Sequence, residues 1–322
     1  MTTPTLATAG RLGHLTDPQA ETLRAFQREL ILDNHFIPSY HDEHLLLRFL
    51  RARRFDIPKA KAMLYACDSW RATEKVPELA KHFEFPEAEA VRAFYPQYYH
   101  NVDKLGRPVY VEHLGAVDIK KITAISSMER MQQKLIFEYE KSIDERFPAC
   151  SLIAGTHLEQ SCTIIDLSGV SLMYFPQVGS FVKQIAQIGQ DYYPEQLGTM
   201  FIINAPMLFS SVWSLIKPFL DEATVKKIHI LGYSYKKSLL EYIDEDKLPA
   251  RLGGKCKCDG GCEASDVGPW HSVPASDLAK VKAETTARNE ALMRSVLEED
   301  AKAKEQIKVT DEPPAADGAP AS

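Results

Sequence analysis

The chain has 322 residues, of which 45% are hydrophobic and 25% charged, and its 38 basic and 44 acidic residues give a formal net charge of −6. This composition is typical of a globular protein with a proper core, and it excludes a collagen-like or wholly disordered chain. The slight excess of acidic residues argues against nucleic-acid binding, which normally requires a basic surface. Apolar runs such as Met200 to Ile203 are far shorter than the roughly 20 residues that a membrane-spanning helix needs.

Two further features concern the cellular setting. The first 15 residues mix small and polar side chains without an apolar segment, so we expect no secretory signal. Six cysteines are too few for a disulfide scaffold, which favours a reducing compartment. We therefore expect a soluble, cytoplasmic, mixed α/β protein with a flexible N-terminus over residues 1–16.

Residues 17–90 show the pattern of a small helical bundle. Asp17 followed by Pro18 is typical of a helix start, with the Asp17 side chain as the capping acceptor. Apolar residues then recur at helical spacing from Leu23 to Leu30. A second helix is predicted through Leu45 to Leu50, and a third begins near Asp56.

From about Phe94, short apolar or β-branched runs alternate with helix-length stretches. The expected strands are Pro108 to Glu112, Cys162 to Leu167, Met200 to Asn204 and Ile228 to Gly232. Helices are expected between them over 126–146, 175–188 and 208–227. This alternation predicts crossover connections and a mostly parallel sheet within residues 91–270. The strand from Cys162 is too continuously apolar to be half exposed, so it should be central.

Residues 271–322 form a third zone, which we interpret as a charged tail. The stretch from Ser276 to Lys308 is rich in Lys, Glu and Ala and is predicted to be helical. The stretch from Asp311 to Ser322 is rich in Pro, Ala and Asp and is expected to be disordered.

Signatures of catalysis and of metal binding are weak. The chain contains no nucleophile elbow, phosphate-binding loop, dinucleotide fingerprint or His-Glu-x-x-His motif. His41-Asp-Glu-His44 has the wrong spacing for two ligands on one helix face, so we interpret it as a solvated helix start. Cys256, Cys258 and Cys262 could bind a metal, but no fourth ligand with standard zinc spacing follows, and a surface loop of reduced thiols is the simpler interpretation. We expect no catalytic residue, no cofactor and no metal, and therefore no enzyme.

A basic cluster and a pair of hydroxyls each allow two interpretations. Arg48, Arg51, Arg53 and Arg54 form a solvated helix face or an anion site, to which Lys226 and Lys227 could add positive charge. Ser161 and Thr163 lie two apart on one predicted strand, so both hydroxyls face the same side. They form a polar stripe or two donors for one phosphate.

The apolar segment from Pro206 to Asp221 also has two interpretations. Phe209, Val212 and Ile216 recur in it at helical spacing. An apolar helix face usually packs into a core, but Trp and Phe are also favoured where a lid seals a cavity or enters a membrane interface.

Six motifs stand in chain order: Leu46-Leu-Arg-Phe-Leu-Arg-Ala-Arg-Arg-Phe-Asp56, Phe94-Tyr-Pro-Gln-Tyr-Tyr-His100, Asp103-Lys-Leu-Gly-Arg-Pro-Val-Tyr110, Ser161-Cys-Thr-Ile-Ile-Asp-Leu167, Tyr192-Tyr-Pro-Glu195 and Ile203-Asn-Ala-Pro206. Together they resemble the CRAL-TRIO lipid-binding family, and most of all its phosphatidylinositol/phosphatidylcholine transfer proteins of the secretory pathway. The resemblance covers about Leu23 to Trp270. It implies an α/β fold in which an N-terminal helical domain precedes a mostly parallel sheet, whose flanking helices enclose an apolar lipid pocket under a mobile gate helix.

The resemblance also implies residue roles. The phosphatidylinositol headgroup would contact Arg53, Arg54, Glu195, Thr224 and Lys227. The phosphatidylcholine headgroup would contact Tyr99, Tyr110, Tyr139, Ser161 and Thr163. The gate would comprise Phe209, Val212, Trp213, Ile216 and Phe219, with Gly198 and Gly254 at hinge positions. Two departures affect headgroup preference: Arg54 stands where the family often has Lys, and Gly189 replaces a hydroxyl residue.

The function implied by the resemblance is phospholipid transfer. The protein would bind phosphatidylinositol and phosphatidylcholine one at a time and link lipid metabolism to Golgi trafficking and protein transport. We expect a monomer that contacts Golgi or endosomal membranes transiently. A carrier or sensor for a sterol, tocopherol or squalene-like lipid is the alternative, and a regulatory or catalytic protein that uses the fold for targeting is a third possibility.

Overall fold

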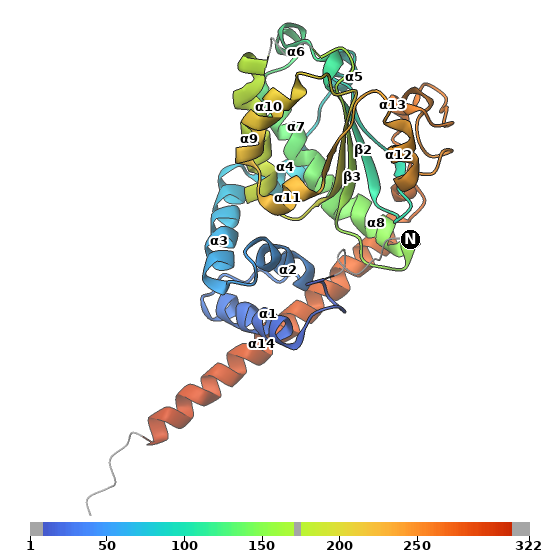
Figure 1. Ribbon diagram of the computed structural model, residues 1–322. Helices are drawn as coiled ribbons and strands as arrows, with labels where there is room; N and C mark the ends of the chain where they lie inside the picture. Colours follow the sequence, from blue (N-terminus) through green and yellow to red (C-terminus); the bar gives the residue numbers. More distant parts are fainter. Residues whose placement is uncertain (1–8, 171–174, 311–322) are drawn as a thin grey trace, which may run out of the picture. The chain divides into compact units, whose positions relative to one another are not determined.

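The computed structural model describes residues 9–170 and 175–310, so the expected disorder of 311–322 lies outside the described residues, as does half of the expected flexible N-terminus. The chain divides into two compact units (Figure 1): one comprises Met1–Lys61 with Ala279–Ser322, and the other Ala62–Leu278. The described parts contain no helix with the length and hydrophobicity required to cross a bilayer.

The first unit is helical. It contains α1 (Asp17–Leu32), α2 (Glu43–Ala52), the start of α3 (Ile57–Thr73) and most of α14 (Ala275–Thr310). Its core is the predicted apolar face of α1 together with α2, whose residues 45–50 are all buried. The long α14 confirms the helix predicted from Ser276, and it packs within this unit because Asn289 Nδ2 donates to the Pro38 carbonyl at 2.9 Å.

The two helix starts are capped by side chains, one of them different from the prediction. Thr16, not Asp17, caps α1, because its hydroxyl accepts from the Gln19 amide while the Gln19 side chain accepts from the Thr16 amide. The His41–His44 motif does begin a helix, because Asp42 Oδ1 accepts from the Leu45 amide at 2.7 Å. It is not solvated as predicted, since His41 is fully buried.

The second unit contains a five-stranded sheet in the order β1-β2-β3-β4-β5, in which each strand neighbours the next along the chain. The strands are β1 (Gln97–Val102), β2 (Pro108–His113), β3 (Ser161–Asp166), β4 (Leu197–Ile203) and β5 (Ile228–Ile230). Only the β1–β2 pair is antiparallel, and β3 is central, as predicted. The prediction missed β1, whose residues are mostly polar, and made β5 too long.

The helices of the second unit lie before, between and after the strands in the chain. They are α4 (Val76–His82), α5 (Ala88–Arg92), α6 (Ile119–Ile125), α7 (Met128–Lys141), α8 (Phe147–Ala154), α9 (Phe175–Asp191), α10 (Phe209–Ile216), α11 (Glu222–Lys226), α12 (Lys236–Tyr242) and α13 (Cys262–Ser265). A π-helical turn over Ser142–Arg146 joins α7 to α8, and a 3-10 turn over Lys217–Phe219 follows α10. The single helix predicted over 208–227 is therefore divided into α10, this turn and α11.

The two faces of the sheet differ in packing. One face forms a closed core against α12 and the residues after it, and its members are Tyr98, Val109, Val111, Cys162, Ile164, Phe201, Ile203, Leu239, Ile243, Leu248 and Leu252. The opposite face lies toward α9 and α10, while α12 and α13 lie on the other side of the sheet (Figure 1). On this second face, Ile165 of β3 and Met200 of β4 remain partly exposed although both strands are interior. We call it the open face.

Candidate functional site

Polar side chains form a row across the open face of the sheet. Tyr99, Tyr110 and Thr163 are register partners on β1, β2 and β3, so they lie side by side. The centroids of the Tyr99 and Tyr110 rings are 5.1 Å apart, and Ser161 Oγ lies 3.4 Å from Thr163 Oγ1 on the same strand. The structure thus gathers four of the five residues expected at a choline headgroup.

Tyr139, the fifth member of that set, projects from α7. Its ring stacks on Tyr193 with centroids 4.3 Å apart. Burial raises the pKa of the Tyr139 phenol, and the nearby Tyr99 and Glu112 raise it further. A Cβ atom placed on Gly189 would lie 3.1 Å from the Tyr139 hydroxyl, so the glycine leaves this hydroxyl accessible where a larger side chain would crowd it.

Sequence reasoning missed two residues of the π-helical turn that contact Tyr99, namely Ser142 and Arg146. The Ser142 and Tyr99 hydroxyls are hydrogen-bonded at 3.0 Å, and the buried Arg146 guanidinium lies 3.9 Å from the centre of the Tyr99 ring. Arg146 also forms an ion pair with Glu138 at 2.9 Å. The guanidinium lies over the face of the ring and forms a cation–π interaction with it. The π-helical turn, a feature often found at functional sites, is not visible in the residue pattern.

Glu112 and Lys134 add two partly buried ionisable groups beside the tyrosines. Glu112 accepts hydrogen bonds from the hydroxyls of Tyr95 and Tyr110. Burial raises the pKa of Glu112, and burial lowers the pKa of Lys134, whose Nζ donates to the Gln97 side chain at 3.2 Å. The end of the open face near β1 and β2 is therefore polar and partly desolvated. The alternation of Tyr110 and Glu112 along β2 was the signal that could have revealed Glu112.

The residues expected at an inositol phosphate are divided between the two units. In the second unit, Lys227 Nζ lies 3.2 Å from Glu195 Oε2, and both side chains are partly exposed. Glu195 has a φ of +62°, a left-handed conformation that a non-glycine residue rarely adopts, so its position is imposed by the surrounding fold. The Thr224 hydroxyl donates to Asp221 Oδ2 at 2.6 Å.

In the first unit, the basic cluster does not form one continuous helix flank as predicted. The helix α2 ends at Ala52, and Arg53 follows as its C-cap residue. Arg54 is exposed and has a φ of +53°, so the chain turns away from the helix direction at this residue. Arg48 is buried, Arg51 donates to the Gly10 carbonyl at 3.1 Å, and the Arg53 guanidinium donates to the Ala52 carbonyl at 3.0 Å.

The expected gate segment places an apolar helix against the open face. In α10, Phe209 and Val212 are buried, and they pack with Trp213 and Ile216 against the apolar residues of β3, β4 and β5. The other side of the segment is exposed and mixed in character. Met207, Leu208, Leu215 and Phe219 have exposed fractions of 97%, 71%, 60% and 45%. Ser210, Ser211 and Ser214 are exposed between them, so the segment is apolar toward the sheet and partly apolar toward solvent.

The two expected hinge glycines both stand where backbone approaches closely. A Cβ on Gly198 would lie 2.9 Å from the Ser161 carbonyl oxygen, at an irregularity of the β3–β4 register. A Cβ on Gly254 would lie 1.9 Å from the Leu248 carbonyl oxygen. Tight packing thus accounts for both glycines, and their hinge role stays a prediction.

Within the described part of the second unit, the grouped donors suited to a metal are those of His100 and the three loop cysteines. His100 alternates with Tyr99 along β1, so it faces away from the tyrosine row. The donors are therefore separate from the open face.

Comparison with known proteins agrees with this architecture. The model of the CRAL/TRIO domain matches residues 94–254, and that of the CRAL/TRIO N-terminal domain matches residues 12–66. The Sec14 cytosolic factor of Schizosaccharomyces pombe is 51% identical over 265 residues, which cover 82% of this chain and 92% of the relative. The SEC14 cytosolic factor of Kluyveromyces lactis is 44% identical over 270 residues, with 83% and 89% coverage.

Two further similarities are more limited in extent. The phosphatidylinositol/phosphatidylcholine transfer protein SFH12 of Arabidopsis thaliana is 43% identical over 256 residues, which cover 78% of this chain and 47% of that protein. The crystal structure of Sfh5 matches the fold with a TM-score of 0.54 at 19% identity, covering 69% of this chain and 82% of that one. The domain matches, the sheet order and the identity to full-length relatives together show that the chain belongs to the CRAL-TRIO family.

Proposed function

We propose that this protein transfers phosphatidylinositol and phosphatidylcholine between membranes and binds them one at a time. The observation that carries the proposal is the open face of the sheet. Along β3 it changes from hydroxyl-bearing Ser161 and Thr163 to apolar Ile165, which stays partly exposed and lies beside the apolar cluster that packs against α10. A surface that is polar at one end and apolar at the other suits a phospholipid better than a uniformly apolar ligand.

The energetics explain why such a carrier needs a sheltered apolar surface. A two-chain phospholipid has on the order of 30 methylenes, each worth about 0.8 kcal/mol when removed from water. Spontaneous escape from a bilayer therefore faces a barrier of roughly 20 kcal/mol or more. A carrier lowers this barrier by covering the chains before they meet water, and it breaks no covalent bond, so we infer no enzymatic step.

The headgroup assignments come from the family resemblance, and the charge of each group supports them. The Tyr99, Tyr110 and Tyr139 phenols, whose pKa values are all raised by burial, stay neutral and offer aromatic surface to a quaternary ammonium group. Arg53, Arg54, Lys227 and the Thr224 hydroxyl would bind the inositol phosphate, whose negative charge requires cationic donors, and Glu195 would accept from the inositol hydroxyls. The carboxylate of Glu195 would release Lys227 for the phosphate.

We further propose that membrane contact is brief and is made by the exposed side of the gate segment. Its residues Met207, Leu208 and Leu215 are exposed apolar side chains suited to a bilayer interface. The net charge of −6 opposes strong adhesion to anionic lipid, which favours release. On this proposal the protein acts as a cytoplasmic monomer that visits Golgi or endosomal membranes and thereby couples lipid metabolism to trafficking.

The test is to identify the lipids that the purified chain carries and to measure their exchange. Mass spectrometry of the chloroform extract should find phosphatidylinositol and phosphatidylcholine, together about one lipid per chain. Purified chain should also move both labelled lipids between vesicles. A sterol, tocopherol or squalene-like lipid as the main species would favour the alternative carrier, and an extract without any lipid, together with no exchange, would refute lipid transfer altogether.

A further inference from the structure

A second cluster of chemically active side chains lies at the edge of the sheet, away from the open face. It joins His100 of β1 to Cys256, Cys258 and Cys262, and the ligand atoms of all four residues lie within 4.8 Å of one another. His100 is buried, while the three cysteines are partly buried and form no disulfide. The sequence separates the histidine from the first cysteine by more than 150 positions, so local spacing could not reveal the fourth ligand.

The distances between the ligand atoms fit a tetrahedral metal site. His100 Nε2 lies 3.4 Å from Cys256 Sγ, and the sulfurs of Cys256 and Cys258 are 3.7 Å apart. Zinc–sulfur bonds of about 2.3 Å and zinc–nitrogen bonds of about 2.0 Å place ligand atoms of a tetrahedron roughly 3.5–3.8 Å apart. The two pairs are thus already spaced as two edges of a zinc coordination shell.

The backbone holds the cysteines in place by hydrogen bonds that need no metal. The Cys256 amide donates to the Leu248 carbonyl at 3.0 Å, and the Cys256 carbonyl accepts from the Ala250 amide at 3.0 Å. Between Cys258 and Cys262 the chain reverses through Gly260 and Gly261, whose φ values of +74° and +91° favour glycine. This turn returns Cys262 to the other two thiols.

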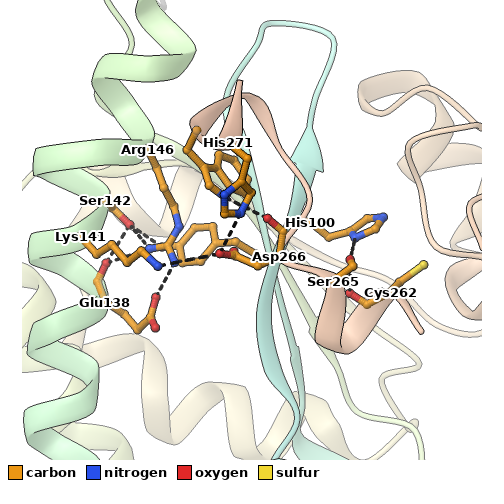
Figure 2. A network of polar contacts seen from close by, with 11 residues as sticks. His100, Glu138, Lys141, Ser142, Arg146, Cys262, Ser265, Asp266 and His271 are labelled. Atoms are coloured by element: carbon orange, nitrogen blue, oxygen red, sulfur yellow. Dashed lines mark hydrogen bonds and ion pairs between the residues drawn. The ribbon is translucent and has the colours of Figure 1, made fainter. Parts of the chain in front are cut away.

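The hydrogen bonds of His100 set the tautomer that a metal ligand requires (Figure 2). Ser265 Oγ donates its proton to the Cys262 carbonyl at 3.0 Å, so it accepts from His100 Nδ1, which is 3.2 Å away. Nδ1 therefore carries the imidazole proton, and the lone pair of Nε2 points toward the sulfurs. The side-chain nitrogen Nδ2 of Asn101 lies 3.4 Å from Nε2. Because Nδ2 can only donate, this contact also requires Nε2 to be the unprotonated nitrogen. Such support of the second ring nitrogen is typical of metal-bound histidine.

We propose that His100, Cys256, Cys258 and Cys262 bind one Zn²⁺ ion as a closed structural site. Three thiolates and one imidazole form a soft ligand set that favours zinc over magnesium or calcium. Because four protein ligands complete the tetrahedron, no position remains for substrate. Binding releases the three thiol protons to solvent, and a site of charge −1 results from the +2 ion and three thiolates.

The consequence of such a site is that the segment after β5 and α12 is fastened to the edge strand. The backbone N–H of Asn101 already donates to the Val267 carbonyl at 2.6 Å, and α13 packs along β1. Edge strands offer unpaired backbone groups to other chains, so a cover held by metal protects β1 from such pairing. The same segment continues to Trp270, which packs beside Cys150 in the core next to α8.

The experiment uses the full chain, purified under reducing conditions without chelator. Elemental analysis should find about one zinc per chain, and replacement by Co²⁺ should give the thiolate charge-transfer band and the intense visible bands of a tetrahedral site. Cys258→Ser should lower Co²⁺ affinity at least about tenfold, and Ser265→Ala by roughly tenfold through loss of histidine support. Cys150→Ala, which alters a thiol outside the cluster, should leave metal content and affinity unchanged.

Three results would overturn the proposal. They are less than a tenth of an equivalent of zinc after reconstitution, a Cys258→Ser chain that binds Co²⁺ as tightly as the parent, or a mass lower by two hydrogens that reveals a disulfide among the loop cysteines. Circular dichroism of each variant checks that the fold is intact. If Cys258→Ser does not fold, Ser265→Ala and its Co²⁺ spectrum still decide the question.

Discussion

The two faces of the sheet are built from alternating residues of the same strands, yet they are packed to different degrees. Ile164 faces α12 and is fully buried, whereas its neighbour Ile165 faces α10 and remains partly exposed. Burial of apolar area stabilises the folded chain, so the closed face supplies more stability per residue. The open face gives up part of that stability, and the apolar surface left uncovered is what a lipid chain would contact.

The largest effect is expected from a matched pair of truncations. Ile164→Ala should lower the free energy of unfolding by about 3 kcal/mol, because it opens a cavity in a closed core. Ile165→Ala should cost about 1 kcal/mol, since its side chain is already partly exposed. Urea denaturation of the lipid-free chain measures both. Equal losses would show that the two faces are packed alike.

The next largest effect is expected on the transfer of one lipid or the other, when residues proposed to contact its headgroup are changed. Lys227→Ala should lower phosphatidylinositol transfer by about tenfold, the scale of one lost charge-assisted hydrogen bond, and should spare phosphatidylcholine transfer. Lys226→Ala is the matched control, because Lys226 is exposed and pairs with Glu222. Ser161→Ala with Thr163→Ala should have the reverse selectivity. A parallel loss of both lipids in either variant would contradict separate headgroup contacts.

A pH effect is expected from the carboxyl group beside the tyrosine row. Burial raises the pKa of Glu112 above its ordinary value of 4.5, so the folded chain holds the proton more tightly than the unfolded chain. The stability linked to this proton is complete below pH 4.5 and is lost as the pH rises through the raised pKa. Glu112→Gln should remove this decline in the free energy of unfolding. Unfolding curves measured between pH 4 and 8 would show it, because the pH dependence should then correspond to about one titrating group fewer. A decline unchanged by the substitution would assign it to another residue.

The smallest effect is expected at the end of the gate segment. The Gln190 side chain donates to the Phe219 carbonyl at 2.6 Å and accepts from the Asp221 amide at 2.8 Å. Gln190→Ala should therefore loosen only the cover of the open face and raise the rate of lipid exchange about two- to threefold, with less than about 1 kcal/mol lost in stability. Gln184→Ala on the same helix is the control, because its side chain bonds Gln132 of α7 instead. A slower exchange in Gln190→Ala would mean that the contact supports the open gate.

The central position of β3 and the shared face of Ser161 and Thr163 could be predicted from local sequence patterns, whereas the tyrosines of the row were implied only by the family resemblance. The continuous apolar run from Cys162 indicated a central strand, and the spacing of Ser161 and Thr163 indicated a shared face. The strand β1 escaped prediction because its half-exposed edge residues are mostly polar, which weakens the alternation signal.

The parts that could not be predicted depend on backbone conformations or on distant partners. The end of α2 at Ala52 follows from the left-handed conformation of Arg54, which the run of arginines does not reveal. Arg146 reaches Tyr99 from a π-helical turn that shifts the helical register. His100 lies more than 150 residues before the first of the cysteines and meets them only in the folded chain, so no local spacing rule reveals the cluster.

The consecutive order of the strands has a mechanical consequence. The strands β2 to β5 are parallel neighbours joined in sequence. Crossovers between parallel strands are right-handed as a rule, which places their connecting segments on the same side of the sheet. The segment from 204 to 227 is the last of these connections, tied at one end to β4 and at the other to β5. On the proposed gate role, opening of this segment would break and re-form side-chain contacts, while the hydrogen bonds between the strands would stay in place.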